Sequence, residues 1–197
     1  MAFNSAVLAF DTSGPFCAAA VLIDGKVTAC RANEMARGQA EAIMDIIEDV
    51  LERSSIQLDQ LTRIGVGTGP GNFTGIRIAV SAARGFALSL KIPAIGINGF
   101  EATLRDQPDD TIACLPALRD QLYFAGRDML PQMGTLEQIA RLHRPIFTRP
   151  EPLQFVQNIA HLAGNAKQFA RPVPMYVKPA DAAPARELPP RVLDDTA

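Results

Sequence analysis

The stretch Ile64-Gly65-Val66-Gly67-Thr68-Gly69-Pro70-Gly71-Asn72-Phe73-Thr74-Gly75-Ile76-Arg77 decides the fold of this chain. A short β-branched strand enters a glycine-rich turn, and the turn opens a helix that runs to Leu90. Gly69 and Gly71 permit a sharp bend, which Pro70 stiffens. Thr74 is the predicted N-cap of the helix, and the free N–H groups behind it would face an anion.

This turn does not match the regular phosphate-binding motifs. A Walker loop ends in Gly-Lys-Ser/Thr, whereas Gly75 is followed here by Ile76 and Arg77. The dinucleotide fingerprint needs a glycine three places after Gly69, where Asn72 stands. The pattern therefore favours a tight connection that packs a helix on a sheet over a nucleotide site.

The composition and net charge limit the kinds of protein that this chain can be. A chain of 197 residues with 48% hydrophobic residues can form one large domain or two small lobes with a sizeable core. The net charge of −2 gives no general attraction to nucleic acid. No membrane span or cleavable leader is apparent, and three cysteines without a Cys-x-x-Cys spacing suit reduced thiols, so a cytoplasmic protein is expected.

Hydrophobic patterning predicts an α/β order of three strands, helix, strand, helix and strand in the N-terminal half. The Asp24-Gly25 pair predicts a hairpin between the second and third strands. Helix-linked strands are parallel by the crossover rule, which is the layout of a ribonuclease-H-like lobe. The predicted elements are Val7–Phe10, Cys17–Ile23, Lys26–Arg31, a helix Gln39–Arg53, Ile64–Thr68, a helix Thr74–Leu90 and Pro93–Ile97.

The C-terminal half is less regular. We expect an N-terminal lobe at residues 1–104 and a smaller second lobe at residues 105–197, with a proline-rich, extended tail from Arg171 onwards. The elements predicted here are helices at Gly99–Arg105, Leu136–Leu142 and Pro152–Ala163, and strands at Thr111–Leu115 and Leu122–Gly126.

The helix Thr74–Leu90 is apolar on almost all sides, with one polar stripe formed by Arg77, Ser81 and Arg84. A helix of this kind is covered on more than one side. A sheet covers one side only, so a second protein chain is one candidate for the rest. Coverage by the preceding helix and the second lobe of the same chain is the equally weighted alternative.

Several segments resemble the TsaB family, a non-catalytic subunit of bacterial tRNA threonylcarbamoyladenosine biosynthesis. The stretch from Gly69 to Ile78 is similar to the family signature and is the most specific of these segments. Val7 to Ser13 resembles the opening strand and first loop of the actin/hexokinase/Hsp70-like fold. Weaker similarities follow in the expected order at residues 37–44, 119–123, 162–166 and 174–182.

The resemblance implies a two-lobed, ribonuclease-H-like fold with mixed sheets flanked by helices. It implies that the chain is not an enzyme, but activates a TsaD-like paralogue that transfers threonylcarbamoyl to the adenosine beside the anticodon of tRNA. A TsaE-like ATPase would complete the complex, tRNA would be met only through it, and the chain alone would form homodimers. The family interface uses the two N-lobe helices, which here contribute Ala42, Ile43, Ile46, Arg53, Arg77, Ser81, Arg84 and Leu88.

The alternative is an enzyme of the actin-like ATPase class, a nucleotide-dependent phosphotransferase or hydrolase. Asp11 would then be a base or a ligand of magnesium-bound water, although capping the turn after its strand is an equally good role. No resident cofactor or metal is expected, weak adenine-nucleotide binding stays open, and no Ser/His/Asp or Cys/His set indicates a protease. The phosphate contacts would come from Asp11, Thr12, Ser13, Gly69, Gly71 and Thr74.

Overall fold

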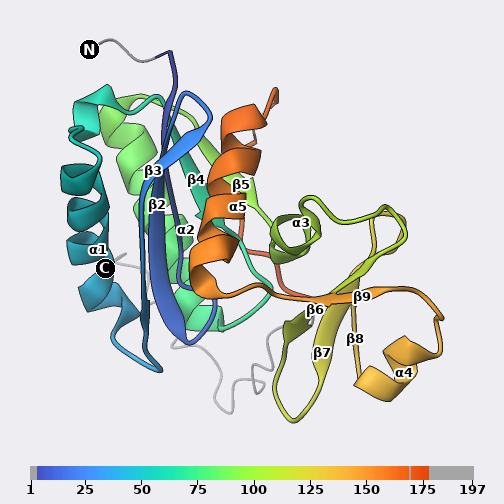
Figure 1. Ribbon diagram of the computed structural model, residues 1–197. Coiled ribbons are helices and arrows are strands. Elements are labelled where there is room, and N and C mark those ends of the chain that lie inside the picture. The colour runs from blue at the N-terminus through green and yellow to red at the C-terminus, as the bar shows by residue number, and fades with distance from the viewer. Residues whose placement is uncertain (1–3, 169, 178–197) are drawn as a thin grey trace, which may run out of the picture.

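The computed structural model describes residues 4–168 and 170–177 and contains two separate sheets (Figure 1). The first sheet is five-stranded, with the order β3-β2-β1-β4-β5. The first three strands are antiparallel neighbours, and β4 and β5 add parallel to β1, as the crossover rule predicts. The strands are β1 Ala6–Asp11, β2 Phe16–Ile23, β3 Lys26–Glu34, β4 Arg63–Gly67 and β5 Ala94–Ile97.

Helices cover both faces of the first sheet (Figure 1). α1 (Gln39–Arg53) and α2 (Phe73–Leu90) bury their apolar stripes against one face. α5 (Pro152–Asn165) packs against the other face. β1 and β2 are therefore buried almost throughout, which explains their continuous apolar sequences.

The second sheet is four-stranded and much less thickly covered. Its strand order is β8-β7-β6-β9. α3 packs on one face and the five-residue α4 packs on the other through Ile139. The elements are α3 Gly99–Leu104, β6 Ile112–Pro116, β7 Leu122–Ala125, β8 Gln132–Gly134, α4 Leu136–Ala140 and β9 Ile146–Thr148, and a short 3-10 helix at Leu58–Gln60 precedes β4.

The chain returns to the first sheet after the second is complete. α5 follows β9 in the sequence but lies on β1, β2 and β4. Arg63 of β4 holds the far end of α5 by donating hydrogen bonds of 3.1, 2.8 and 2.9 Å to the carbonyls of Ala163, Gly164 and Ala166. A cation that satisfies the last carbonyls of a helix is a favourable cap. The boundary between residues 104 and 105 remains a prediction, because the first sheet takes one of its covering helices from beyond it.

Residues 170–177 have no regular secondary structure, in agreement with the proline-rich pattern, and the rest of the predicted extended tail lies outside the described residues. No helix in the described part of the chain is both long and apolar enough to cross a membrane.

Candidate functional site

The glycine-rich turn packs tightly against the loop between β1 and β2. A Cβ atom on Gly71 would lie 2.2 Å from the carbonyl oxygen of Ser13, so only glycine fits there. The backbone N–H of Asn72 donates to the same oxygen at 2.7 Å. Gly69 has a φ of 91° and accepts a hydrogen bond of 2.7 Å from the N–H of Gly99. These contacts connect the glycine-rich turn to the β1–β2 loop and to the start of α3.

The N-cap of α2 is Asn72, so the prediction of Thr74 was wrong. The Asn72 side chain accepts a hydrogen bond of 2.9 Å from the N–H of Gly75. Both residue types favour caps, and the helix begins one residue earlier than expected, at Phe73. Thr74 is an exposed residue inside the first turn.

The expected phosphate contacts do not form an open cradle in this structure. Asp11 and Thr12 have no exposed surface, Ser13 is 2% exposed, and Gly69 is buried. The Thr12 hydroxyl donates to the carbonyl of Gly75 at 2.6 Å. Asp11, Thr12, Ser13 and Gly69 are thus packed against protein or bonded to it, whereas Gly71 is half-buried and Thr74 is exposed.

Asp11 has the turn-capping role that the sequence left as an alternative. Its Oδ1 accepts hydrogen bonds from the backbone N–H of Ser13 at 2.9 Å and from the Ser13 hydroxyl at 2.8 Å. Its Oδ2 has no hydrogen-bond partner among the described residues and lies over Gly67, where a Cβ atom would be 1.6 Å away. Burial raises the pKa of Asp11, while the bonds from Ser13 and the charge of Arg149 partly oppose that rise.

Two of the four interface residues expected on α1 are not accessible. Ile43 and Ile46 are 2% and 1% exposed and belong to the core between α1 and the first sheet. The prediction that they meet a partner was therefore wrong, because the stripe that contains them faces the protein's own sheet. Ala42 is half-buried, and Arg53 is exposed and pairs with Asp49 at 3.4 Å.

The outward face of α2 does present the residues expected there. Arg77, Ser81 and Leu88 are exposed, and Arg84 is half-buried. Leu88 is 82% exposed, and a Cβ atom on Gly85 would meet nothing within 4 Å. We call Arg77, Ser81, Arg84, Gly85 and Leu88 the α2 face.

The C-terminal segment 171–177 borders the α2 face. Arg84 donates to the carbonyl of Pro172 through Nε at 2.9 Å and also through Nη2. Arg77 lies 3.9 Å above the Phe73 ring and donates to the hydroxyl of Tyr176 at 3.1 Å, and the Phe73 and Tyr176 rings are 4.9 Å apart. Sequence reasoning missed these partners, since they lie about a hundred positions apart in the chain.

Most of the apolar surface of α2 is shielded within the chain. The sheet and α1 cover the inner sides, as the alternative interpretation predicted. That interpretation assigned the rest to the second lobe, predicted at residues 105–197, and segment 171–177 from this range borders the outer side. Phe73 and Leu88 remain exposed by 39% and 82%.

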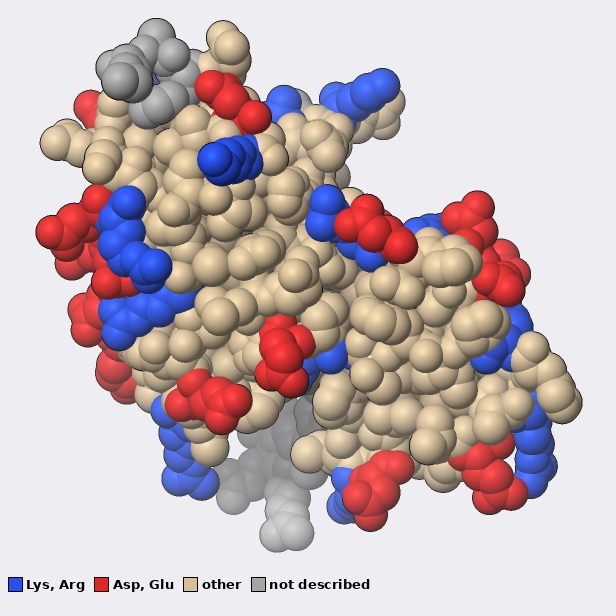
Figure 2. All heavy atoms as spheres, viewed as in Figure 1, with Lys and Arg blue, Asp and Glu red and all other residues tan. Residues whose placement is uncertain are grey.

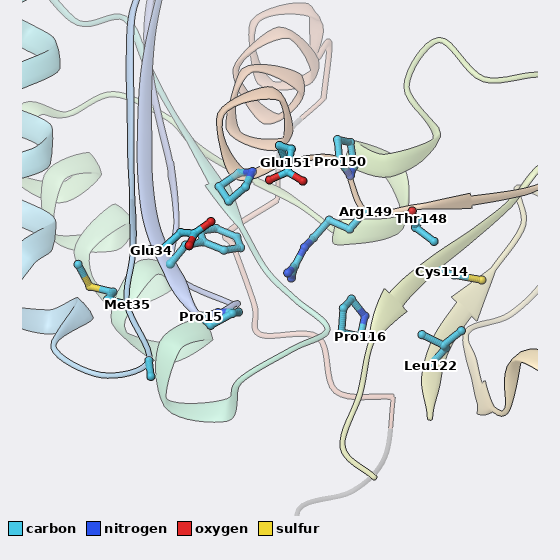
Figure 3. A pocket seen from close by; sticks show the side chains of 13 residues that line it. Pro15, Glu34, Met35, Cys114, Pro116, Leu122, Thr148, Arg149, Pro150 and Glu151 are labelled. Carbon is cyan, nitrogen blue, oxygen red and sulfur yellow. The ribbon is translucent and has the colours of Figure 1, made fainter. Parts of the chain in front are cut away.

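A cleft of about 600 Å³ lies where the two sheets approach each other (Figure 3). Its walls come from the β1–β2 loop, the end of β3, the ends of β6 and β7, and the segment between β9 and α5. Arg149 points into it and lies 5.0 Å from the Phe16 ring centroid (Figure 3). Burial lowers the pKa of Arg149, and the charges of Asp11 and Glu151 oppose that effect. No motif in the sequence marked this residue.

The charged and metal-ligating side chains of the described residues are spread over the molecule and are not gathered in one cluster. They contain no group of three His, Cys, Asp or Glu side chains that could hold a metal ion. Figure 2 shows basic and acidic side chains intermixed over the visible face, without a broad basic surface.

Comparisons with known proteins place this geometry in a family. The family model described as TsaD: tRNA N6-adenosine threonylcarbamoyltransferase matches residues 32–177, well over half of the chain. The chain belongs to the TsaD/TsaB family. Among relatives, it is 32% identical over 128 residues to the tRNA threonylcarbamoyladenosine biosynthesis protein TsaB of Haemophilus influenzae, covering 62% of this chain and 53% of that protein. TsaB of Escherichia coli is 35% identical over 92 residues, which are 47% of this chain and 39% of that protein.

Solved structures agree with the TsaD/TsaB assignment at the level of fold. A Pseudomonas aeruginosa protein described as similar to peptidase YEAZ aligns with a TM-score of 0.71 and 20% identity, covering 88% of this chain and all of that chain. YeaZ from Pseudomonas aeruginosa aligns with a TM-score of 0.67 and 21% identity, covering 87% of this chain and 99% of that one. The predicted α/β class, with mixed sheets flanked by helices, is confirmed. In sequence, the chain spans about half the length of the curated relatives it matches.

Proposed function

We propose that this chain takes part in tRNA threonylcarbamoyladenosine biosynthesis as a non-catalytic partner that binds and activates a TsaD-like enzyme. That enzyme would transfer threonylcarbamoyl to the adenosine beside the anticodon. The names of the relatives support the pathway, since TsaB of Haemophilus influenzae and of Escherichia coli are both named as biosynthesis proteins for this modification.

The observation that carries the partner role is the exposure of Leu88 on the α2 face. Covering a leucine side chain is worth roughly 1.5–3 kcal/mol, so a partner that covers Leu88, which is 82% exposed on a regular helix, would be stabilised by that contact. Ser81 and Gly85 lie on the same face, and their small size permits a partner helix to approach closely. Arg77 and Arg84 lie beside this apolar point and would contact acidic groups at its rim.

A subunit role also fits the packing of Asp11. An actin-like nucleotide hydrolase needs a carboxylate that meets magnesium-bound water, whereas Asp11 is fully buried and bonded to Ser13. We further propose that a TsaE-like ATPase joins the complex, that the chain alone forms homodimers through the α2 face, and that tRNA is contacted through the complex. The intermixed charges in Figure 2 support that last point, because strong RNA binding needs a basic surface.

The test uses Leu88→Glu in the full chain. A carboxylate in an apolar contact loses the burial energy and adds a desolvation cost, so affinity for a purified TsaD-like protein should fall at least about tenfold, or about 1.4 kcal/mol. Titration calorimetry measures the affinity. Threonylcarbamoyl transfer to tRNA with all components, with and without this chain, measures the activation.

Leu130→Glu is the matched control. Leu130 is 83% exposed, nearly the same as Leu88, but it lies beside the second sheet, between β7 and β8. It should leave both binding and activation unchanged. Undiminished binding by Leu88→Glu, or an equal loss in both variants, would refute the assigned surface. Transfer by the chain without a TsaD-like protein would refute the non-catalytic role.

A further inference from the structure

The cleft between the two sheets is a mainly apolar cavity. Four prolines form much of its wall, and the side chains of Phe16 and Met35 add apolar surface. Proline fixes its own φ and offers no N–H group, so these four residues have a restricted backbone and donate no hydrogen bond from it. A volume of about 600 Å³ accommodates a small ligand together with water. The prolines are Pro15, Pro116, Pro150 and Pro152.

Arg149 brings a cation with unused donors into this cavity. Its backbone N–H is fixed to the carbonyl of Cys114 at 3.0 Å, and its guanidinium lies near the rings of Phe16 and Phe155, at 5.0 and 5.9 Å from their centroids. Gly14 leaves room for the guanidinium, because a Cβ atom there would lie 2.9 Å from Nη1. Within residues 4–168 and 170–177, the guanidinium makes no hydrogen bond and no ion pair within 4.0 Å. A planar fork of this kind is suited to binding a carboxylate in a bidentate manner.

The start of α5 adds a second group that favours an anion. α5 has fourteen residues and begins at Pro152, with Glu151 as an N-cap that makes no side-chain capping bond. The first helix amides are therefore not satisfied by a cap, and the positive end of the helix dipole lies at the cavity wall. Arg149 and this helix end thus act on the same space.

Two carboxylates face the same cavity from its rim. Glu34 and Glu151 both line it, and Figure 3 shows Glu34 to the left of the Arg149 guanidinium and Glu151 above it. Both residues are exposed, and neither forms an ion pair with a described residue. A simple dianion such as phosphate would be repelled by them. A ligand that carries one cation and one anion would satisfy all three charged groups.

We propose that this cavity binds a small zwitterion with an apolar body, of the class of the apolar α-amino acids. Its carboxylate pairs with Arg149 near the start of α5, its ammonium group lies toward Glu34 and Glu151, and its side chain contacts the proline walls. This site is separate from the α2 face, so it does not depend on the partner role proposed above.

The test compares three leucine-based probes that carry different charges, with the full chain. L-Leucine carries both charges, N-acetyl-L-leucine keeps the carboxylate alone, and L-leucinamide keeps the ammonium group alone. We expect saturable binding of L-leucine by NMR chemical-shift titration, with at least tenfold weaker binding of the two singly charged probes. The shifted resonances should be those of cavity residues such as Cys114 and Arg149.

Variants then assign each charge. Arg149→Met should weaken L-leucine binding at least tenfold, and Arg149→Lys should weaken it less, since the charge is retained without the bidentate fork. The double change Glu34→Gln and Glu151→Gln should weaken L-leucine binding but not that of N-acetyl-L-leucine. Arg141→Met is the control, because Arg141 is an exposed residue at the C-cap of α4 that pairs with Glu137, and its binding curve should match the wild type.

Several outcomes would overturn the proposal. Binding of N-acetyl-L-leucine as tight as that of L-leucine would show an anion site without a role for the glutamates. L-Leucine binding that survives in both Arg149 variants, or no saturation at tens of millimolar in a folded wild-type chain, would remove the site. Tighter binding of ATP that is lost in Arg149→Met would reassign the cavity to a nucleotide.

Discussion

Ile159 of α5 and Ile139 of α4 are both fully buried, yet they belong to cores of very different size. Ile159 lies in a cluster that joins α5 to four strands of the first sheet. Among the described residues, the cluster of Ile139 has three other buried members, Ile112, Cys114 and Phe124, and three partly buried ones, Leu122, Met129 and Ile146. The first sheet has helices of fourteen residues or more on each face, whereas one face of the second sheet is covered by the five residues of α4.

This difference in helix cover indicates that the first sheet is the more rigid part of the molecule and the second sheet the more easily opened part. Local stability follows the amount of buried apolar contact, so the first sheet should open only with the whole fold, and the second sheet should open more readily. The α2 face is built on the rigid part. Residues of both sheets line the cleft that contains Arg149, so movement of the second sheet would change the width of this cleft.

The largest effect should come from truncating the two buried isoleucines. Ile159→Ala should lower the free energy of unfolding by about 4 kcal/mol, because the surrounding core of the first sheet cannot collapse into the cavity. Ile139→Ala should cost about 2 kcal/mol, because α4 is short and can shift toward β6 and β7. Urea unfolding followed by circular dichroism measures both, and equal losses would contradict the contrast between the two cores.

An effect smaller than that of Ile159→Ala is expected from two changes, one in the first turn of α2 and one in the β6–β7 hairpin. Gly75→Ala in the first turn of α2 should destabilise the chain by about 3 kcal/mol, because its Cβ would lie 1.9 Å from the carbonyl oxygen of Thr12. Asp120→Gly in the β6–β7 hairpin should stabilise it by about 0.5 kcal/mol, since Asp120 has a φ of 55° in an exposed turn.

Gly85→Ala is the matched control for the first change. It makes the same substitution in the same helix, at a position where a Cβ atom meets nothing within 4 Å. Alanine is the better helix former, so a gain of about 0.5–1 kcal/mol is expected. Thermal unfolding of the three variants tests the signs, and a loss at Gly85 similar to that at Gly75 would refute the packing argument.

The sequence predicted the first sheet well because its elements are long and periodic. α1 was predicted with the observed bounds, and the hairpin at Asp24-Gly25 and the parallel placement of β4 and β5 are confirmed. Strands of three residues, β8 and β9, were not predicted, because they are too short to show a period. Patterning located the second sheet only in part for the same reason.

The candidate sites were harder to predict, because they depend on contacts between distant residues. Ile43 and Ile46 were expected at a partner interface, but periodicity alone does not show whether an apolar side chain packs on its own sheet or on another chain. The cleft forms because the chain returns to the first sheet through α5, which places Arg149 beside Phe16. This contact joins residues that are far apart in the sequence, so patterning could not predict it. Leu88, which was expected at the partner interface, is exposed in one helical stripe with Arg77, Ser81 and Arg84, and its contact with a partner stays a prediction.

The smallest expected effect concerns the two buried thiols. Cys17 lies in the core of the first sheet and Cys114 in that of the second, and neither has exposed surface. Burial raises the pKa of Cys17 to about 12, with a smaller contribution from Asp11, and raises that of Cys114 to about 11. Neither thiol is nucleophilic at pH 8 in the closed fold, so each can react only when its surroundings open.

Labelling with iodoacetamide at pH 8, followed by mass spectrometry, measures those openings. Half-buried Cys30 should react first, then Cys114, and Cys17 last. A difference of about 1 kcal/mol in opening free energy corresponds to about fivefold in rate, so Cys114 should react at least about five times faster than Cys17. Labelling in denaturant, where the three rates should converge, is the control. If Cys17 reacts as fast as Cys114 under native conditions, the two sheets open as one cooperative unit, and the second sheet is no softer than the first.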